Sequence, residues 1–207
     1  MSLTGNHLRL AFKALNGAAS AASQTSKKPV GVFALGGWNA RQLGIDRMTK
    51  DLDVNIYTSA DAFSTLKAKL EALKEQGVNV KASSTNTRIS ATWTDPANSQ
   101  IHVGLDIHQK DPQQQPKDKV LTLKMDDYSF ETYNFEGFLE SKIKAAGERI
   151  KSSDSLDIVK ICSLRKVDLI ESVKNGKISV TQTQLNAAVT NHSDVKAALE
   201  SIGYKFQ

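Results

Sequence analysis

The stretch LGGWNARQLGIDRMTKDLDV, residues 35–54, decides how the rest of the sequence is interpreted. It contains a Gly-Gly pair at 36–37 and an Asp-x-Asp motif at 51–53. The almost wholly apolar run at 30–35, directly before it, predicts a buried strand that leaves its sheet through a tight glycine turn. The segment therefore predicts a strand, a turn, a short helix and a second strand that carries two acids.

The second strand has one buried face. Residues Asp51 to Tyr57 alternate polar and apolar side chains, and the apolar positions 52, 54 and 56 are expected to face the core. Side chains two apart share a face of a strand, so Asp51 and Asp53 lie on the opposite, open face. The segment Ile101 to His108 alternates in the same way and leaves Asp106 on its open face. If the two strands are neighbours, three carboxylates converge.

Three such carboxylates indicate a metal site. Close acids repel one another and raise one another's pKa, so a cluster of this kind usually holds a cation. Ligation by oxygen alone favours Mg²⁺ or Mn²⁺ over zinc, and Mg²⁺ commonly accompanies a phosphate substrate. The predicted ligands are Asp51, Asp53 and Asp106. Gly36 and Gly37, at the start of a helix, offer backbone N–H groups to a triphosphate.

The remaining patterns predict an α/β fold, with a mixed sheet flanked by helices and a helical C-terminal region. We expect a core over residues 1–130, preceded by a helix at 4–22, and a helical region over 131–207. The other predicted elements are a loop at 23–29, a helix at 61–76, strands at 78–82, 88–94 and 120–125, a loop at 110–119, and helices at 135–150, 154–173, 181–190 and 193–202.

Composition excludes several classes of protein. The single cysteine among 207 residues rules out a disulfide framework and a cysteine-built zinc site. Cys162 lies in the apolar run 156–164 and is predicted to be a small buried hydrophobe. No apolar stretch approaches the roughly 20 residues of a membrane span, and the N-terminus lacks the features of a signal peptide. A reducing compartment, the cytoplasm or nucleus, is the expected location.

The positive charge is concentrated at the beginning of the chain. Of a formal net charge of +5, the first 50 residues carry seven Lys and Arg against Asp46 alone. This distribution suits a phosphate-rich ligand, and it equally fits lysines on a solvated surface.

The motifs together resemble a known superfamily. LGGWNAR at 35–41, followed by RMTKDLDV at 47–54 and LDI at 105–107, is similar to the polymerase-β-type nucleotidyltransferases. Within them it most resembles the AbiEii-like branch, which pairs a Gly-Gly or Gly-Ser turn with Arg-x-Ser/Thr-x-Asp-Leu-Asp. The resemblance spans roughly residues 30–165. It implies transfer of a nucleoside monophosphate from an NTP to a hydroxyl, with pyrophosphate leaving.

The resemblance also implies roles for residues. Asp51, Asp53 and Asp106 would be catalytic and would hold Mg²⁺ or Mn²⁺. The nucleotide-binding residues that it implies are Gly36, Gly37, Arg47, Thr49 and Lys142. An RNA end, such as the acceptor end of tRNA, is the implied acceptor, and a protein antitoxin is a possible partner of such a toxin.

Several residues have two interpretations. Lys142 and Arg149 fall at the edge of the apolar stripe of the helix at 135–150, and a lysine held against a core needs an anionic partner. That partner is either the NTP phosphates or a structural ion pair with Asp154 or Asp157.

Three residues with ring side chains near the predicted site also have two interpretations each. His102 and His108 flank Asp106, either as metal ligands or proton-transfer groups, or as partly exposed strand residues. Trp38 follows the glycine pair and either stacks on a base or belongs to the core.

Three functional alternatives accompany the nucleotidyltransferase hypothesis. The acceptor could be a small molecule or a protein instead of RNA. A catalytically degenerate relative would bind a nucleotide or a partner without turnover. An interaction protein with incidental strand-edge acids would show separated carboxylates and no nucleotide binding.

Overall fold

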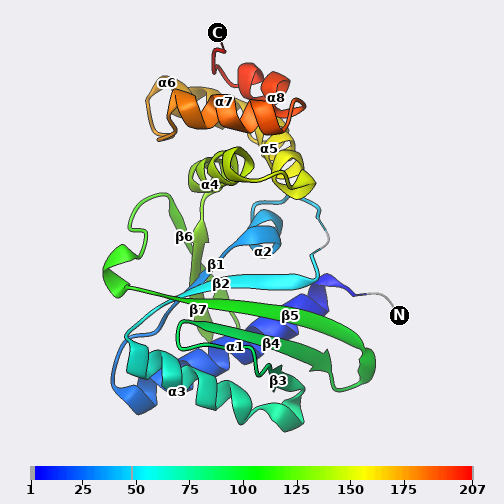
Figure 1. Ribbon diagram of the computed structural model, residues 1–207, viewed down its shortest axis with the longest axis vertical. Helices are drawn as coiled ribbons and strands as arrows, with labels where there is room; N and C mark the ends of the chain where they lie inside the picture. Colours follow the sequence, from blue (N-terminus) through cyan, green and yellow to red (C-terminus); the bar gives the residue numbers. More distant parts are fainter. Residues whose placement is uncertain (1–2, 48, 207) are drawn as a thin grey trace. The chain divides into compact units, whose positions relative to one another are not determined.

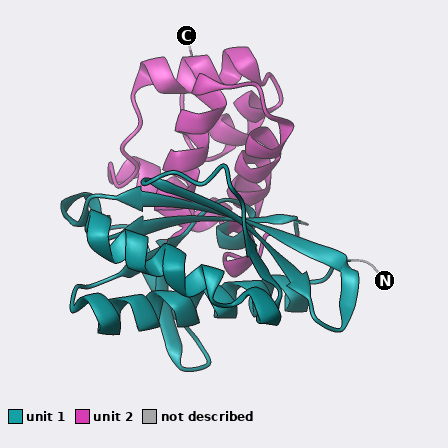
Figure 2. Cartoon of the chain, turned by 60° about the horizontal axis from the view of Figure 1, so that its bottom comes forward, with its two compact units in different colours: residues 1–39, 47–132 teal, residues 40–46, 133–207 magenta. Residues whose placement is uncertain are grey.

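A computed structural model describes residues 3–47 and 49–206. The chain divides into two compact units, coloured separately in Figure 2. Unit 1 comprises residues 1–39 and 47–132, and unit 2 comprises 40–46 and 133–207. Unit 2 therefore takes a short segment from between the two parts of unit 1, and the division falls inside helix α2, Gly36–Gln42.

Unit 1 is built on a seven-stranded mixed sheet with the order β3-β4-β5-β2-β1-β7-β6 (Figure 1). The strands are β1 (Gly31–Ala34), β2 (Asp51–Tyr57), β3 (Val78–Val80), β4 (Arg88–Asp95), β5 (Asn98–Lys110), β6 (Val120–Met125) and β7 (Tyr128–Tyr133). β2 runs parallel to β5 and antiparallel to β1, and β4 runs antiparallel to β5. The predicted α/β class with a mixed sheet is confirmed.

Two helices, α1 (Gly5–Ser26) and α3 (Ala60–Glu71), cover one face of this sheet (Figure 1). Thr4 caps α1, and its backbone N–H donates to His7 Nδ1 at 2.9 Å. The apolar residues of both helices form one core with the buried positions of β2, β4 and β5. Burial of each large side chain contributes about 1.5–3 kcal/mol. Trp38 belongs to this core, with its ring centroid 5.5 Å from that of Phe12, which supports the core interpretation of this residue.

Unit 2 is helical. It contains α4 (Phe135–Glu148), α5 (Ser152–Leu164), α6 (Lys166–Lys174), α7 (Gln182–Asn191) and α8 (Val195–Ser201). Capping explains where two of them begin. The Asn134 side chain accepts a hydrogen bond from the Gly137 N–H at 3.0 Å, and Thr181 forms a capping box with Gln184.

The core of unit 2 is a separate cluster. Ala40, Leu43 and Ile45 from the short segment at 40–46 join the buried faces of the C-terminal helices in it. Cys162 lies in this cluster with 1% of its surface exposed, as predicted. Burial raises the pKa of its thiol to about 12, so Cys162 behaves as a small hydrophobe.

Some predicted elements differ from the structure in unit 1. The segment 23–26, predicted as a loop, continues α1, and the Ser26 hydroxyl donates to the Ala22 carbonyl at 2.8 Å. The chain leaves the helix at Lys27, which has a left-handed φ of 56°. The predicted helix at 61–76 ends at Glu71 and is followed by a 3-10 turn at Lys74–Gln76. Strand β7 was not predicted.

Two predictions for the helical region were also wrong. The single helix expected over 154–173 is two helices, because the chain turns at Arg165, where φ is −119° and ψ is 31°. Ile150, the last residue of the helix predicted at 135–150, lies beyond the end of α4 and is 82% exposed. Among the described helices, none has both the length and the apolar character needed to cross a membrane.

Candidate active site

Strands β2 and β5 place three aspartates on the face of the sheet away from α1 and α3. Positions 52, 54 and 56 of β2 are buried, which directs Asp51 and Asp53 to the other side. In the parallel register of the two strands, Asp53 lies opposite Asp106. All three acids line one pocket of about 230 Å³. Lys81, Arg88 and Ser90, from the β3–β4 side, also line it.

The glycine turn is packed tightly against this pocket. Gly36 has a φ of +58°, and a Cβ atom there would lie 2.2 Å from Asp53 Oδ2. A Cβ atom on Gly37 would lie 2.6 Å from the Cβ of Thr49. Any larger residue at Gly36 would be strained and would also displace the Asp53 carboxylate. The structure thus brings together the glycine pair and one of the two acids of the Asp-x-Asp motif.

A third glycine belongs to the site and was not singled out from the sequence. Gly104 pairs with Asp51 in the register of β5 and β2, and a Cβ atom there would lie 2.2 Å from Asp51 Oδ1. Gly104 makes room for this carboxylate on the crowded sheet surface. A glycine at a polar-face position of the second acid-bearing strand was the available signal, but its meaning depends on the strand register.

The third acid is held by two basic side chains. Arg88 Nε lies 2.8 Å from Asp106 Oδ1, and Arg88 Nη2 lies 2.9 Å from Asp106 Oδ2. His108 Nε2 lies 3.3 Å from Oδ1 of the same carboxylate. Partial burial raises the pKa of Asp106, but hydrogen bonds and charge from Arg88 and His108 outweigh it and hold that pKa below its ordinary value. Asp106 is therefore a carboxylate at neutral pH.

Two further predicted nucleotide-binding residues lie just before β2 in unit 1. The Thr49 hydroxyl donates to the Asp51 carbonyl at 2.9 Å and so fixes the start of the strand. Arg47 is partly buried.

Lys142 lies in unit 2, inside a buried ion cluster. Its Nζ atom lies 2.9 Å from Asp154 Oδ1 and 2.8 Å from Asp157 Oδ2. Arg149 Nε lies 2.8 Å from Asp154 Oδ2. Burial raises the pKa of Asp154, but the hydrogen bonds from Arg149 and Lys142 outweigh it, so the pKa is lowered. The structure therefore shows the ion-pair alternative for Lys142, with both candidate aspartates as partners.

The other polar candidates have local partners. His102 Nδ1 lies 3.0 Å from Thr94 Oγ1. Three cations of the basic first quarter pair with nearby acids. Arg9 and Lys13 both contact Asp126, the latter at 3.0 Å. Lys28 contacts Asp61 at 2.5 Å. These pairs support the solvated-surface interpretation for that part of the charge.

The three carboxylates of the pocket offer oxygen ligands of the kind that a hard divalent cation prefers. The backbone at Gly36 and Gly104 lies close to two of them, Asp53 and Asp51. Over residues 3–47 and 49–206, no group of three His, Cys, Asp or Glu side chains stands ready to hold a metal ion. Both oxygens of Asp106 are instead bonded to Arg88.

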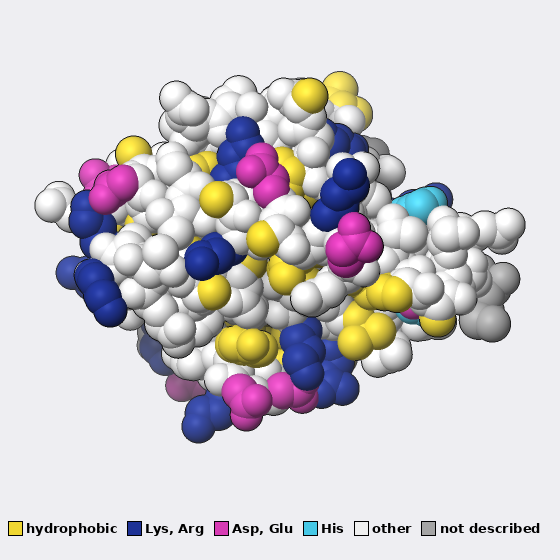
Figure 3. Space-filling model, turned by 90° about the horizontal axis from the view of Figure 1, so that it is seen from below, with side chains coloured by type: hydrophobic (Ala, Val, Ile, Leu, Met, Phe, Trp, Pro, Cys, Tyr) yellow, Lys and Arg dark blue, Asp and Glu magenta, His cyan; other side chains and the backbone are white. Residues whose placement is uncertain are grey.

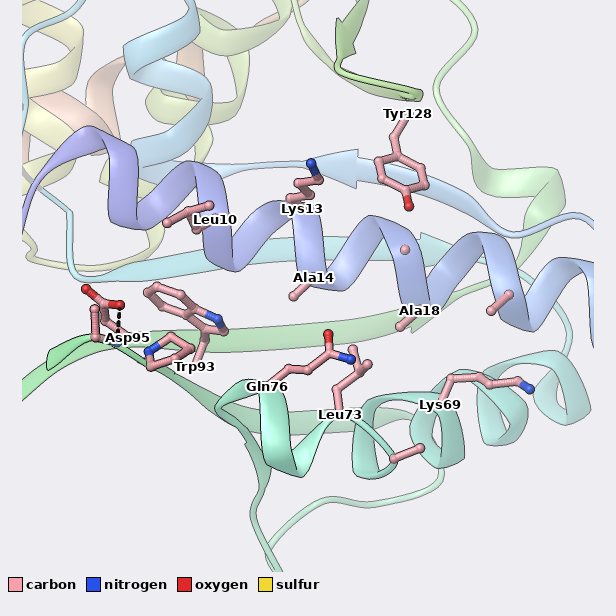
Figure 4. Close-up of a pocket in the computed structure, with 15 residues that line it drawn as sticks. Leu10, Lys13, Ala14, Ala18, Lys69, Leu73, Gln76, Trp93, Asp95 and Tyr128 are labelled. Atoms are coloured by element: carbon pink, nitrogen blue, oxygen red, sulfur yellow. Dashed lines mark hydrogen bonds between the residues drawn. The ribbon is translucent and has the colours of Figure 1, made fainter. Parts of the chain in front are cut away.

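A larger hollow, of about 690 Å³, lies on the opposite side of unit 1 between α1 and α3 (Figure 4). Its lining is mostly apolar and includes Ala14, Ala18, Leu73 and Trp93, with Lys13 and Lys69 beside them. Viewed from this side, hydrophobic patches alternate with basic and acidic side chains (Figure 3). This hollow has one carboxylate in its lining, Asp95, and lacks the converging acids of the smaller pocket.

The fold is that of nucleotidyltransferases. An antigenic nucleotidyltransferase-like protein from Paracoccidioides brasiliensis matches 96% of this chain over 94% of its own, with 17% identity and a TM-score of 0.59. MenT4, a nucleotidyltransferase toxin from Mycobacterium tuberculosis H37Rv, matches 99% of this chain over 91% of its own, with 9% identity and a TM-score of 0.51. At such low identities these likenesses concern the fold alone. No curated protein sequence matches the chain.

The family is shown by the sequence. The family model described as nucleotidyl transferase AbiEii toxin, type IV toxin–antitoxin system, matches residues 40–192. The chain therefore belongs to the AbiEii family of nucleotidyltransferase toxins, and the resemblance seen in its motifs is confirmed.

Proposed function

We propose that this protein transfers a nucleoside monophosphate from an NTP to a hydroxyl group of an RNA, using Mg²⁺ or Mn²⁺ held by Asp51, Asp53 and Asp106. The observation that carries the proposal is the convergence of these three carboxylates in one pocket, with Gly36 and Gly104 leaving them room. Membership in a family of nucleotidyltransferase toxins supports it.

The reaction forms a bond between the acceptor oxygen and the α-phosphorus and breaks the bond from that phosphorus to the bridging oxygen. Pyrophosphate leaves, and the proton of the acceptor hydroxyl is released to solvent. When bound, a divalent ion neutralises triphosphate charge and lowers the pKa of the attacking hydroxyl. Asp51 and Asp53 would hold the ion from one strand, and Asp106 would hold it from the neighbouring strand. Gly36 and Gly37 receive the phosphates against the backbone.

Lys142 has a different position in the proposal. Lys142 can bind the phosphates of the nucleotide only if it gives up its ion pairs with Asp154 and Asp157. Thr49 bonds to the Asp51 carbonyl, and Arg47 precedes it in the chain by two residues. Both stay assigned to the nucleotide in this proposal.

An RNA acceptor is supported by charge. Lys81 and Arg88 line the β3–β4 side of the pocket, where a phosphate-bearing acceptor would find cations. We place the protein in the cytoplasm, where NTPs and RNA are available, and expect an antitoxin to control it.

The first test is a thermal shift with each of the four NTPs, with and without Mg²⁺ or Mn²⁺. A ligand present at a hundredfold excess over Kd stabilises the native state by about 2.7 kcal/mol. We expect one NTP to raise Tm only with metal, and the shift to be lost in the double variant Asp51→Asn/Asp53→Asn. Asp118→Asn is the matched control, because this exposed acid lies outside the pocket lining.

The labelled form of that NTP then identifies the acceptor. Label incorporated into RNA supports the proposal. Label found in a small molecule or a protein would show that the acceptor belongs to that class and not to RNA. A metal-dependent shift without any transfer indicates a degenerate binding protein. The absence of a shift with every NTP and metal refutes nucleotide binding and favours an interaction protein.

A further inference from the structure

Arg88, in the lining of the pocket, binds both oxygens of Asp106. It begins β4, which pairs with β5 so that Arg88 lies opposite His108 and Ser90 lies opposite Asp106. Arg88 therefore approaches Asp106 from a diagonal position on the same face of the sheet. Its planar guanidinium meets the carboxylate with two parallel bonds of 2.8 and 2.9 Å.

These two bonds use the oxygens that a divalent ion needs. A guanidinium and a metal ion cannot occupy the same side of one carboxylate, and their positive charges repel each other. The pair is also accessible to solvent, since the Arg88 side chain is 52% exposed and that of Asp106 is 32% exposed. An exposed pair of this kind exchanges partners at little cost, because water replaces the lost bonds.

We propose that Arg88 is a positioning residue that competes with the divalent ion for Asp106. With Arg88 in place, both oxygens of Asp106 are engaged by the guanidinium, and the three carboxylates complete a metal site only after the guanidinium leaves. This inference rests on the proposed function, because it assumes that Asp106 is a metal ligand.

The test measures Mn²⁺ binding directly, by the electron paramagnetic resonance signal of the free ion, without nucleotide or turnover. Arg88→Gln removes the bidentate pair and is expected to tighten Mn²⁺ binding on the order of tenfold. Arg88→Lys keeps the charge but loses the two-pronged geometry and should fall between wild type and Arg88→Gln. Lys81→Gln is the matched control, since it removes one positive charge from the same pocket without touching Asp106.

A double-mutant cycle isolates the contact. The gain from Arg88→Gln should vanish when Asp106→Asn is already present, because no carboxylate is then released. Circular dichroism of each variant verifies that it is folded.

The outcomes separate the two proposals. If Lys81→Gln tightens binding as much as Arg88→Gln, general electrostatics explain the effect and the inference is overturned. Equal Mn²⁺ affinity of wild type and Arg88→Gln also overturns it, while the metal site stands. If neither protein binds Mn²⁺ at millimolar concentration, the proposed metal-dependent function fails and the inference fails with it.

Discussion

The two units each hold carboxylates next to basic side chains, but in opposite environments. In unit 1, Arg88 and Asp106 meet in an open pocket, with 52% and 32% of their side chains exposed. In unit 2, the Lys142 side chain is 9% exposed, and its partners Asp154 and Asp157 are 1% and 0% exposed.

This difference determines what each cluster can do. Breaking an ion pair in water costs little, because both ions are rehydrated, so the pocket acids remain available to a ligand. Removing one ion from a buried cluster leaves an uncompensated charge without water. We therefore interpret the cluster of unit 1 as exchangeable and that of unit 2 as one whose members must stay together while the helices are folded.

The largest expected effect follows from Lys142→Met. This change leaves two buried aspartates without their shared ammonium group and should lower the free energy of unfolding by about 3–5 kcal/mol. Urea unfolding followed by circular dichroism measures the loss in the helices. Fluorescence follows unit 1, because both tryptophans, Trp38 and Trp93, lie there.

Lys144→Met is the control for this variant, since Lys144 is an exposed residue of the same helix. Equal urea midpoints for the two variants would contradict the structural role of Lys142. Unchanged stability together with a lost NTP-dependent thermal shift would instead assign Lys142 to the nucleotide.

An intermediate effect is expected on acidification. The folded-state pKa of Asp154 is lowered, so its contribution to stability is present above the unfolded value of about 3.9 and is lost as the pH falls through the folded value. Each unit of lowering corresponds to about 1.4 kcal/mol. Urea unfolding at pH values from 5 down to 2 should show a steeper loss of stability for wild type than for Asp154→Asn. Parallel curves would show that Asp154 does not contribute to the acid sensitivity.

The smallest effect is expected for Arg88→Gln. Because the Arg88–Asp106 pair is exposed, its removal should leave the urea midpoint within experimental error of wild type, in contrast to Lys142→Met. A midpoint shift as large as that of Lys142→Met would mean that the pocket pair also supports the fold, and the contrast between the units would fail.

Much of unit 1 was predictable because its signals are local. The alternation at 51–57 gave the strand and its open face, and the glycines at 36–37 gave the turn before α2. Strand β7 was missed because the turn before it contains Asp126 with a φ of 54° instead of a glycine. The break at Arg165 has neither proline nor glycine, and the apolar pattern continues across it, so periodicity indicated one helix.

The candidate site was less predictable where it depends on register. Strand parity placed Asp51, Asp53 and Asp106 on open faces, but only the pairing of β2 with β5 sets Gly104 against Asp51. The contact of Arg88 with Asp106 depends on the antiparallel register of a third strand, β4. The number of residues between Arg88 and Asp106 does not by itself indicate that the two are diagonal neighbours in the sheet.

The segment at 40–46 has a consequence for synthesis on the ribosome. Ala40, Leu43 and Ile45 are translated before the helices that bury them in unit 2. These side chains remain exposed to water or bound to a chaperone until the helices of residues 133–207 leave the exit tunnel. The two units therefore cannot fold strictly one after the other during synthesis, because unit 2 needs residues from both parts of the chain. A polypeptide released after residue 132 would carry the segment 40–46 as an exposed, aggregation-prone stretch.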